Sequence, residues 1–225
     1  MLGISHAASG ALTGLAAAEI THLPATGAVT LSALTAGFVT LSDLDSCGSC
    51  AARSLGFLSE GFAHVVRFIS GGHRHATHSA VGVAIFTAVA WLACHYRGEP
   101  YGRAVLAAFL ALAIAAGLRA LRLGGHYADV LAIGAAAGIA WYGWYLALIP
   151  MACGLGTATH LLGDSLTDVG IPVFWPLSLR HYGLPKPIAF TTGHAVERFA
   201  VDPLIMIGLG VLAYHAVTLP GYVTY

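Results

Sequence analysis

The sequence predicts an all-α membrane protein, a polytopic helical bundle of about seven crossings with an amphipathic helix on its cytoplasmic side. Of its 225 residues, 57% are hydrophobic and only 9% are charged, whereas a soluble domain carries about 25% charged residues. The apolar runs are rich in Ala, Leu and Gly and do not alternate with polar residues, so helices are favoured over strands or an outer-membrane barrel. A net charge of zero argues against nucleic acid as a partner, because that binding depends on clustered positive charge.

Seven apolar stretches are expected to cross the bilayer as parts of a single domain, residues 1–225. A hydrocarbon core requires roughly 20 mostly apolar residues per helix, and four stretches meet this requirement well. Two stretches near the N-terminus are weaker, but they are rich in small residues that let helices approach closely in lipid. One short stretch contains a His and an Asp and should be shielded from lipid. In chain order the stretches are 6–20, 28–42, 80–96, 104–121, 130–151, 154–168 and 203–219.

Residues 51–70 predict a different kind of helix, with an apolar face and a polar face. Apolar residues recur there at spacings of three and four, with charged residues and a His on the opposite side. This pattern is typical of a helix that lies on the bilayer surface, although a soluble cap helix packed on the bundle would show it too. The apolar positions are Leu55, Leu58, Phe62, Val65, Val66 and Ile69.

Seven crossings would place every candidate metal ligand on one side of the membrane. Eight of the ten basic residues fall on that same side, and the positive-inside rule identifies it as the cytoplasm. The result depends on the number of crossings, because the loss of one would divide the cluster. We therefore expect an inner-membrane protein with a cytoplasm-facing site built from seven candidate ligands: His6, Asp43, Asp45, His78, His160, Asp164 and Glu197.

The strongest local motif is the pair His160 and Asp164. Residues four apart share one face of a helix, so an imidazole and a carboxylate there can bind one metal ion. A carboxylate at membrane depth is expensive and is usually functional. The alternative is a buried His–Asp hydrogen bond with no metal.

The pair Asp43 and Asp45 also favours a cation. Neighbouring carboxylates resist joint ionisation, and the C-terminal end of a helix repels negative charge. In a solvated loop, however, two acidic residues would need no metal.

The segment 73–79 contains three His residues and one Arg. His78 is expected to be a ligand or a catalytic group, and the planar guanidinium of Arg74 could bind a phosphate or carboxylate. The alternative is a polar anchor at the headgroups, and the roles of His73 and His75 stay open.

Three further positions are candidates of a weaker kind. Glu197 could be a ligand or a general base, or it could pair with Arg198. Arg119 and Arg122 could bind an anionic substrate headgroup, although simple positive-inside anchoring explains them as well.

Cys47 and Cys50 have the spacing of a redox pair or of half a zinc knuckle. A single CxxC is a weak signal, and reduced free thiols are favoured in a cytosolic setting.

The order of these motifs resembles one family, the LexA-binding, inner-membrane-associated, metal-dependent hydrolases often called YdjM-like. The resemblance runs from the N-terminus to about Glu197 and implies a membrane-embedded hydrolase with a metal centre. Two positions depart from the family pattern, Ser46 after the acidic pair and His75 after the motif Arg. The motifs are His6, then Asp43-Leu-Asp45, then Arg74-x-x-Thr77-His78-Ser79, then His160-x-x-x-Asp164-x-x-Thr167-x-x-Gly170, with Ile171-Pro-Val-Phe-Trp175-Pro176 after them.

Together these features predict a hydrolase of ester or phosphoester bonds that uses a metal-activated water. His78 and Glu197 are candidate catalytic groups, and Arg74 would stabilise negative charge in the transition state. Zinc suits the His content best, with manganese or iron as alternatives. A lipid or phospholipid substrate is favoured because the site would lie at headgroup depth, and another phosphoester is the alternative. A transporter with a His/acid path for protons or metal, and a non-catalytic membrane adaptor, are the alternative functions.

Overall fold

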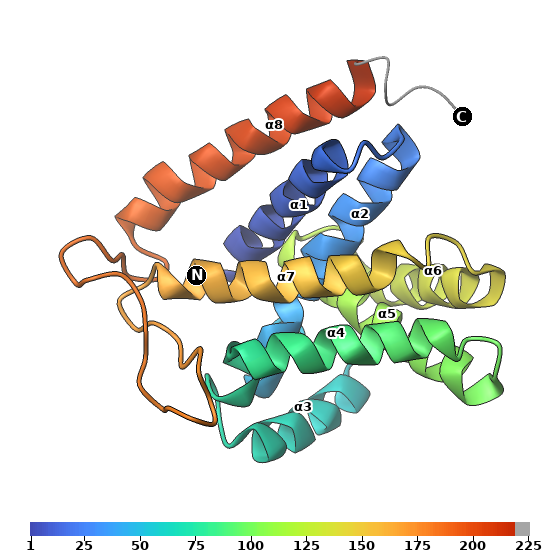
Figure 1. Cartoon of the computed structure of the whole chain (residues 1–225), viewed down its shortest axis with the longest axis horizontal. Coiled ribbons are helices and arrows are strands. Elements are labelled where there is room, and N and C mark those ends of the chain that lie inside the picture. Colours follow the sequence, from blue (N-terminus) through green and yellow to red (C-terminus); the bar gives the residue numbers. More distant parts are fainter. Residues whose placement is uncertain (219–225) are drawn as a thin grey trace.

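The structure is a computed structural model that describes residues 1–218. The described chain contains eight α-helices and no β-strand, which confirms the all-α prediction. The N-terminal pair, α1 (Gly3–Ile20) and α2 (Ala25–Phe38), forms a hairpin in the middle of the molecule (Figure 1). The two helices approach closely, because a Cβ atom placed on Gly14 would lie only 2.6 Å from the Cα atom of Ser32. The small residues of this segment therefore serve helix packing, as expected.

The helix α2 does not stop at Phe38 but tightens into the 3₁₀ helix η1 (Val39–Asp45). A 3₁₀ helix has three residues per turn and is used in short pieces at helix ends. This tightening carries Asp43 and Asp45 to the end of a continuous 21-residue apolar helix, Ala25–Asp45.

The amphipathic helix α3 spans Phe57–Ser70 and is followed by the short 3₁₀ helix η2 (Ala76–His78) and by α4 (Ala80–His95). It begins six residues later than expected because residues 51–56 form turns and Gly56 has a φ of +60°. Such a φ favours glycine and is not helical, so α3 can begin only after Gly56. The large apolar side chains of α3 are exposed, among them Phe57 and Phe68.

The chain continues through α5 (Pro100–Ala120), the 3₁₀ helix η3 (Gly125–Tyr127), α6 (Ala128–Tyr142) and α7 (Leu148–Ser165). The expected single crossing 130–151 is wrong, because the chain turns between α6 and α7. Gly143 ends α6 with a φ of +75°, and Tyr145 has a φ of +55°. The residues expected to end one crossing and to form the next, short crossing instead belong to the single helix α7.

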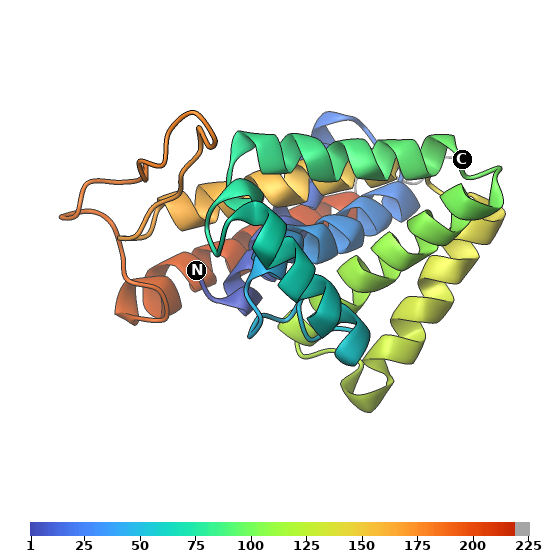
Figure 2. The same cartoon turned by 90° about the horizontal axis from the view of Figure 1, so that it is seen from below.

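A long irregular segment, residues 166–196, leads to the last helix. Figures 1 and 2 show it extending from one end of the helical body. The chain re-enters a helix through a π-helical turn, η4 (Glu197–Val201), followed by α8 (Asp202–Thr218). Position 219, the last residue of the expected crossing 203–219, lies outside the described residues.

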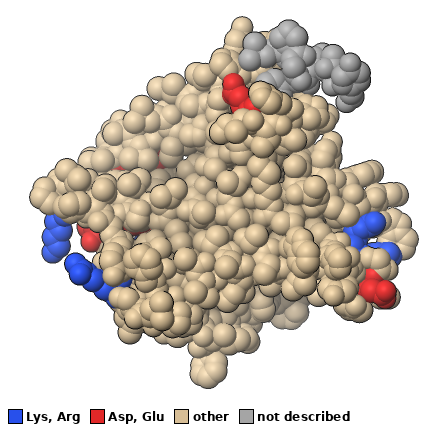
Figure 3. Space-filling model, viewed as in Figure 1, with Lys and Arg blue, Asp and Glu red and all other residues tan. Residues whose placement is uncertain are grey.

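The structure does not support seven membrane crossings. Within residues 1–218, three helical segments are long and apolar enough to span a bilayer: Ala25–Asp45, Pro100–Ala120 and Glu197–Thr218. Ala80–His95 has 16 residues and α6 has 15, so both fall short of the roughly 20 residues a crossing requires. The space-filling view in Figure 3 shows a broad uncharged face with the Lys, Arg, Asp and Glu side chains at its edges. Because the structure does not support seven crossings, a shared side of the membrane does not explain why the polar residues lie together.

Candidate metal centre

Packing, rather than a shared membrane face, brings six of the seven candidate ligands together. They come from the start of α1, the end of η1, the turn η2 and the C-terminal half of α7, which meet near the middle of the molecule. All of them are buried except Asp43, whose side chain is 27% exposed. The six are His6, Asp43, Asp45, His78, His160 and Asp164.

Four of these side chains each bring one potential ligand atom close to the two imidazole nitrogens of the cluster, and we call these four atoms the tetrahedral set, after the coordination proposed below. The Nε2 atoms of His78 and His160 are 3.3 Å apart. Asp43 Oδ1 lies 3.5 Å from the first of these nitrogens and 3.7 Å from the second, and Asp164 Oδ2 lies 3.7 Å from each. A tetrahedral ion with bonds of about 2.0–2.1 Å holds its ligands about 3.3–3.4 Å apart. These five distances are close to that spacing, whereas Asp43 and Asp164 fall in different groups of mutually close ligands, so binding a single ion would require their two carboxylates to move towards each other.

Hydrogen bonds fix both imidazoles of the set in the orientation that a metal requires. His160 Nδ1 donates to the carbonyl oxygen of Val39 at 2.8 Å, which leaves its Nε2 lone pair free. His78 Nδ1 donates to Thr77 Oγ1 at 3.0 Å, and that hydroxyl donates to Asp45 Oδ2 at 2.6 Å. Partners of this kind select the tautomer and ring orientation of metal-binding histidines.

Asp45 lies one layer behind the tetrahedral set. Its carboxylate accepts hydrogen bonds from His73 Nδ1 at 2.8 Å, from the backbone nitrogen of Arg74 at 3.1 Å and from Thr77. These donors use most of its lone pairs, so we assign Asp45 an orienting contact with His78 through Thr77. His73 and Thr77 were not among the candidate ligands; the signals for them in the sequence were the dense His spacing of residues 73–78 and the place of Thr77 in the family motif.

His6 adds a second layer on the other side of the set. Its ring stacks on that of His160 with a centroid separation of 3.8 Å, and its Nε2 lies 3.2 Å from Asp164 Oδ1. Its Nδ1 is buried and has no hydrogen-bond partner within the described chain. An unsatisfied buried nitrogen is costly, so this atom is available to a ligand or to a reacting group.

Arg74 closes the cluster from the loop before η2. Its guanidinium contacts Asp164 Oδ2 at 3.2 Å and the carbonyl oxygen of Gly170 at 3.2 Å. Its backbone has a φ of +60°, an unfavourable conformation for a residue with a side chain. Asp164 also accepts the terminal ammonium of Met1 at 2.7 Å. The Asp164 carboxylate therefore binds two positive groups, the Arg74 guanidinium and the Met1 ammonium, as the ligand of a cation would.

His78 holds its proton more tightly than a free histidine. Burial alone would lower the pKa of its imidazole, but hydrogen bonds and charges from Asp43 and Asp45 outweigh burial and raise the pKa to about 9. In the metal-free protein this group is therefore protonated at neutral pH, and a metal ion must displace that proton.

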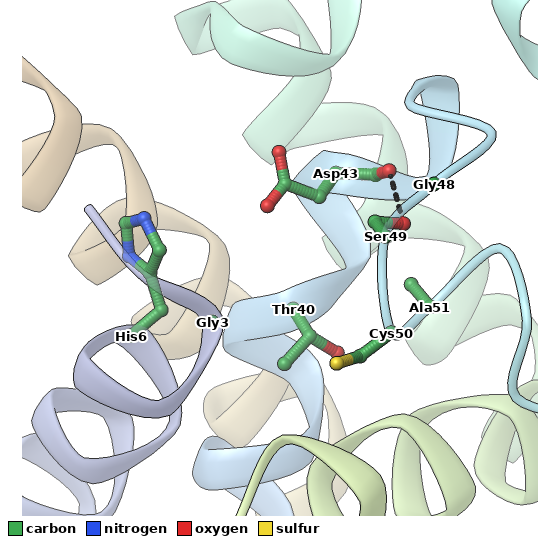
Figure 4. Close-up of a pocket in the computed structure, with 8 residues that line it drawn as sticks. All are labelled: Gly3, His6, Thr40, Asp43, Gly48, Ser49, Cys50 and Ala51. Atoms are coloured by element: carbon green, nitrogen blue, oxygen red, sulfur yellow. Dashed lines mark hydrogen bonds between the residues drawn. The ribbon is translucent and has the colours of Figure 1, made fainter. Parts of the chain in front are cut away.

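A cavity of about 200 Å³ opens beside the cluster. Figure 4 shows His6 and Asp43 on its wall, with the loop after η1 on the opposite side. The cavity borders the cluster through His6 and Asp43, whereas His78, His160 and Asp164 do not line it. Its lining residues are Gly3, His6, Thr40, Asp43, Gly48, Ser49, Cys50 and Ala51.

Cys50 borders this cavity but is poorly suited to act as a nucleophile. Burial and the charge of Asp43 raise the pKa of its thiol, and the reactive form is the thiolate. Cys47 Sγ lies 3.6 Å from His64 Nδ1. Neither cysteine joins a group of three potential metal ligands among the described residues, and all four cysteines are free thiols.

Three candidate residues lie outside the cluster. Glu197 is buried and accepts the backbone N–H groups of Leu2 and Gly193, each at 2.6 Å, so it ties the N-terminal segment to the start of the last helix. Arg119 forms a bidentate pair with Asp129 at 2.7–2.8 Å. Arg122 is exposed on the turn after α5. None of the three has a contact with the tetrahedral set.

The fold and the cluster define a helical membrane protein with a buried His/Asp centre that could hold a metal ion. Three overlapping groups of potential ligands share this centre, and the central one is Asp43, His78 and His160. The chain belongs to the YdjM inner membrane protein family, whose family model matches residues 1–219. This match confirms the resemblance seen in the motifs and, with the apolar helices, indicates the inner membrane. No curated protein and no solved structure matches the chain significantly.

Proposed function

We propose that this protein is a metal-dependent hydrolase of ester or phosphoester bonds. The observation that carries the proposal is the tetrahedral set, in which each carboxylate oxygen lies 3.5–3.7 Å from the two imidazole nitrogens and these nitrogens lie 3.3 Å apart, close to the spacing of ligands around a tetrahedral cation. The adjoining cavity supports the proposal, because a structural metal site needs no access for a substrate.

Asp43, His78, His160 and Asp164 would hold the ion, and Asp45 and Val39 would orient its two imidazoles. A divalent metal bound there supplies a Lewis acid that polarises the scissile group and lowers the pKa of a bound water. Zinc suits two imidazoles and two carboxylates in a tetrahedral arrangement, and manganese or iron are the alternatives.

Two further side chains have geometry suited to the reaction. Arg74 is placed to stabilise negative charge that develops on the scissile group, since its guanidinium already lies 3.2 Å from a carboxylate of the set. His6 lies on the cavity wall with an unpartnered Nδ1, so it is placed to accept a proton from water or donate one to the leaving oxygen. The oxygen of water bonds to the acyl carbon or phosphorus of the ester, and the bond from that atom to the leaving oxygen breaks. The leaving oxygen takes up the proton that water gave up.

Metal content and hydrolysis, measured on the same preparations, test this function. We expect purified wild type to contain a divalent metal by element-resolved mass spectrometry and to hydrolyse model phosphoesters or carboxylic esters. Asp164→Ala should lose both the metal and the activity. His126→Ala, an exposed His in η3 outside every ligand group, is the control and should retain both. A metal-free and inactive wild type, after reconstitution with zinc, manganese and iron, would contradict the proposal.

A further inference from the structure

An apolar groove separates the amphipathic helix α3 from α4 and α5. It consists of two adjoining hollows of about 300 and 380 Å³ that share Phe62, Val89 and Phe109. The surface lining the smaller hollow is apolar throughout. Each hollow falls in the range of about 300–1,000 Å³ that small-ligand pockets occupy. Pockets for water-soluble ligands also present a few polar groups, whereas Ser59, Ser70 and Thr77, which line this groove, expose almost no polar surface to it.

The inner end of the groove reaches the layer behind the metal centre. Leu44, which lies between Asp43 and Asp45 in the chain, lines it together with Thr77. The Thr77 hydroxyl donates to Asp45 and accepts from His78. A molecule that fills the groove therefore ends one residue away from side chains of the tetrahedral set.

The outer wall of the groove faces the environment that surrounds a membrane helix. Val105 on that wall is 48% exposed and belongs to Pro100–Ala120, a segment long and apolar enough to span a bilayer. On the other wall Phe62 is 52% exposed and Ile69 is 74% exposed. The described chain thus leaves a large apolar face uncovered beside a candidate span, and in a bilayer the molecules available to cover it are lipids.

We propose that this groove binds an acyl chain of a bilayer phospholipid and thereby delivers its ester or phosphoester to the metal centre. The wholly apolar lining, the adjoining span and the inner end at Thr77 together favour a hydrocarbon chain with a polar head. The exposed Arg67 on the polar side of α3, whose Nη1 also donates to the carbonyl oxygen of Asp45 at 3.2 Å, offers a positive charge near the head. The chemical step rests on the proposed hydrolase function, whereas the binding step does not.

Kinetics on two substrates test the delivery step. Ile85→Trp places bulk in the groove, and Ala84→Trp places the same bulk on an exposed position of α4 that lines neither hollow. On a long-chain phosphatidylglycerol, Ile85→Trp should lower kcat/KM about tenfold or more, because each buried methylene contributes to binding. On the water-soluble dibutanoyl analogue it should change little, and Ala84→Trp should change neither value. An equal loss on both substrates, or no loss on the long chain, overturns the inference.

Photocrosslinking tests the binding step without reference to activity. Wild type reconstituted in bilayers with phosphatidylglycerol that carries a diazirine in one acyl chain should be labelled preferentially on groove residues of α3, α4 and α5. Labelling there should fall in Ile85→Trp and persist in Ala84→Trp. Labelling spread evenly over the exposed apolar surface of α8, or crosslinks to a second copy of the chain, overturns the inference even if lipid is hydrolysed. Groove labelling without hydrolysis of any ester would instead contradict the proposed function alone.

Discussion

Single hydrogen bonds decide which atoms of this cluster can bind a cation. The bond from His160 Nδ1 to Val39 and the relay from His78 through Thr77 to Asp45 leave both Nε2 atoms free and aim them at one point. The two Nε2 atoms lie 3.3 Å apart, so in the metal-free protein the protonated His78 can donate a hydrogen bond to His160, and a bound cation would take the place of that proton.

Asp45→Asn tests the orienting role of Asp45. The amide keeps the shape of the side chain but removes the charge that receives the Thr77 and His73 donors. We expect metal affinity to fall about 10- to 100-fold, the usual effect of losing a partner of a metal-bound histidine. Competition with a fluorescent chelator measures this. Asp168→Asn, at an exposed acidic residue that accepts from Thr191, is the control, and equal affinities for the two variants would refute the assignment.

The raised pKa of His78 predicts a pH-dependent metal affinity. In the metal-free protein the pKa of this imidazole is about 9, so at neutral pH the ion must release one proton to bind. Affinity should therefore increase about tenfold per pH unit as the pH rises towards 9, and level off above it. Zinc titrations at several pH values in a non-coordinating buffer measure the slope. An affinity that stays constant between about pH 6.5 and 8.5 is the outcome that contradicts this prediction.

The helices position these atoms through unusually close contacts. A Cβ atom on Gly37 would lie 2.6 Å from the carbonyl oxygen of Ala113, so α2 and α5 touch backbone to backbone. Gly163 on α7 is similarly close to His6, with 3.1 Å to its Cε1 atom. Glycines at these positions let the ligand-bearing helices approach to the separation that the cluster requires.

Gly37→Ala should destabilise the bundle. The added methyl group meets backbone that cannot rotate away, and overpacking of this kind costs about 1–3 kcal/mol. Gly138→Ala on α6, where no atom lies within 4 Å of the new methyl group, should be neutral or stabilising by up to about 1 kcal/mol, because alanine is the better helix former. Thermal unfolding in detergent micelles compares the two variants. A midpoint for Gly37→Ala at or above that of wild type would exclude close packing of α2 on α5.

At the scale of the whole molecule, the arrangement is a small membrane body with its polar chemistry enclosed. The long segment 166–196 and the loop between α4 and α5 lie at opposite ends of the body (Figure 1). If the metal centre opens to the cytoplasm, as the sequence predicts, these two regions face different compartments.

Cysteine labelling tests that orientation. In a protein whose native cysteines are replaced by serine, Lys186→Cys reports the exposed segment and Glu99→Cys reports the α4–α5 loop. A membrane-impermeant maleimide should label Glu99→Cys in intact spheroplasts and Lys186→Cys only in inverted vesicles, since basic segments stay in the cytoplasm. The reverse pattern would place the centre on the other side of the membrane.

The sequence by itself determined the helical class, the membrane environment and the chemical types in the centre, because composition, apolar periodicity and a His/Asp pair at i, i+4 are local properties. Local patterns also placed Asp43 and Asp45 at a helix end. They did not reveal the turn at Gly143, which moves the boundary between two expected segments and leaves α6 with 15 residues, too few to cross a bilayer.

Only the tertiary structure decided which atoms meet. It separated Glu197, whose carboxylate binds backbone N–H groups, from the ligands, and it put His73 and Thr77 behind the centre. It also formed the groove beside α3, which no local pattern encodes. The physical reason is that a binding site is defined by distances between side chains far apart in the chain, and those distances follow from how closely glycine-rich helices pack rather than from any spacing along the sequence.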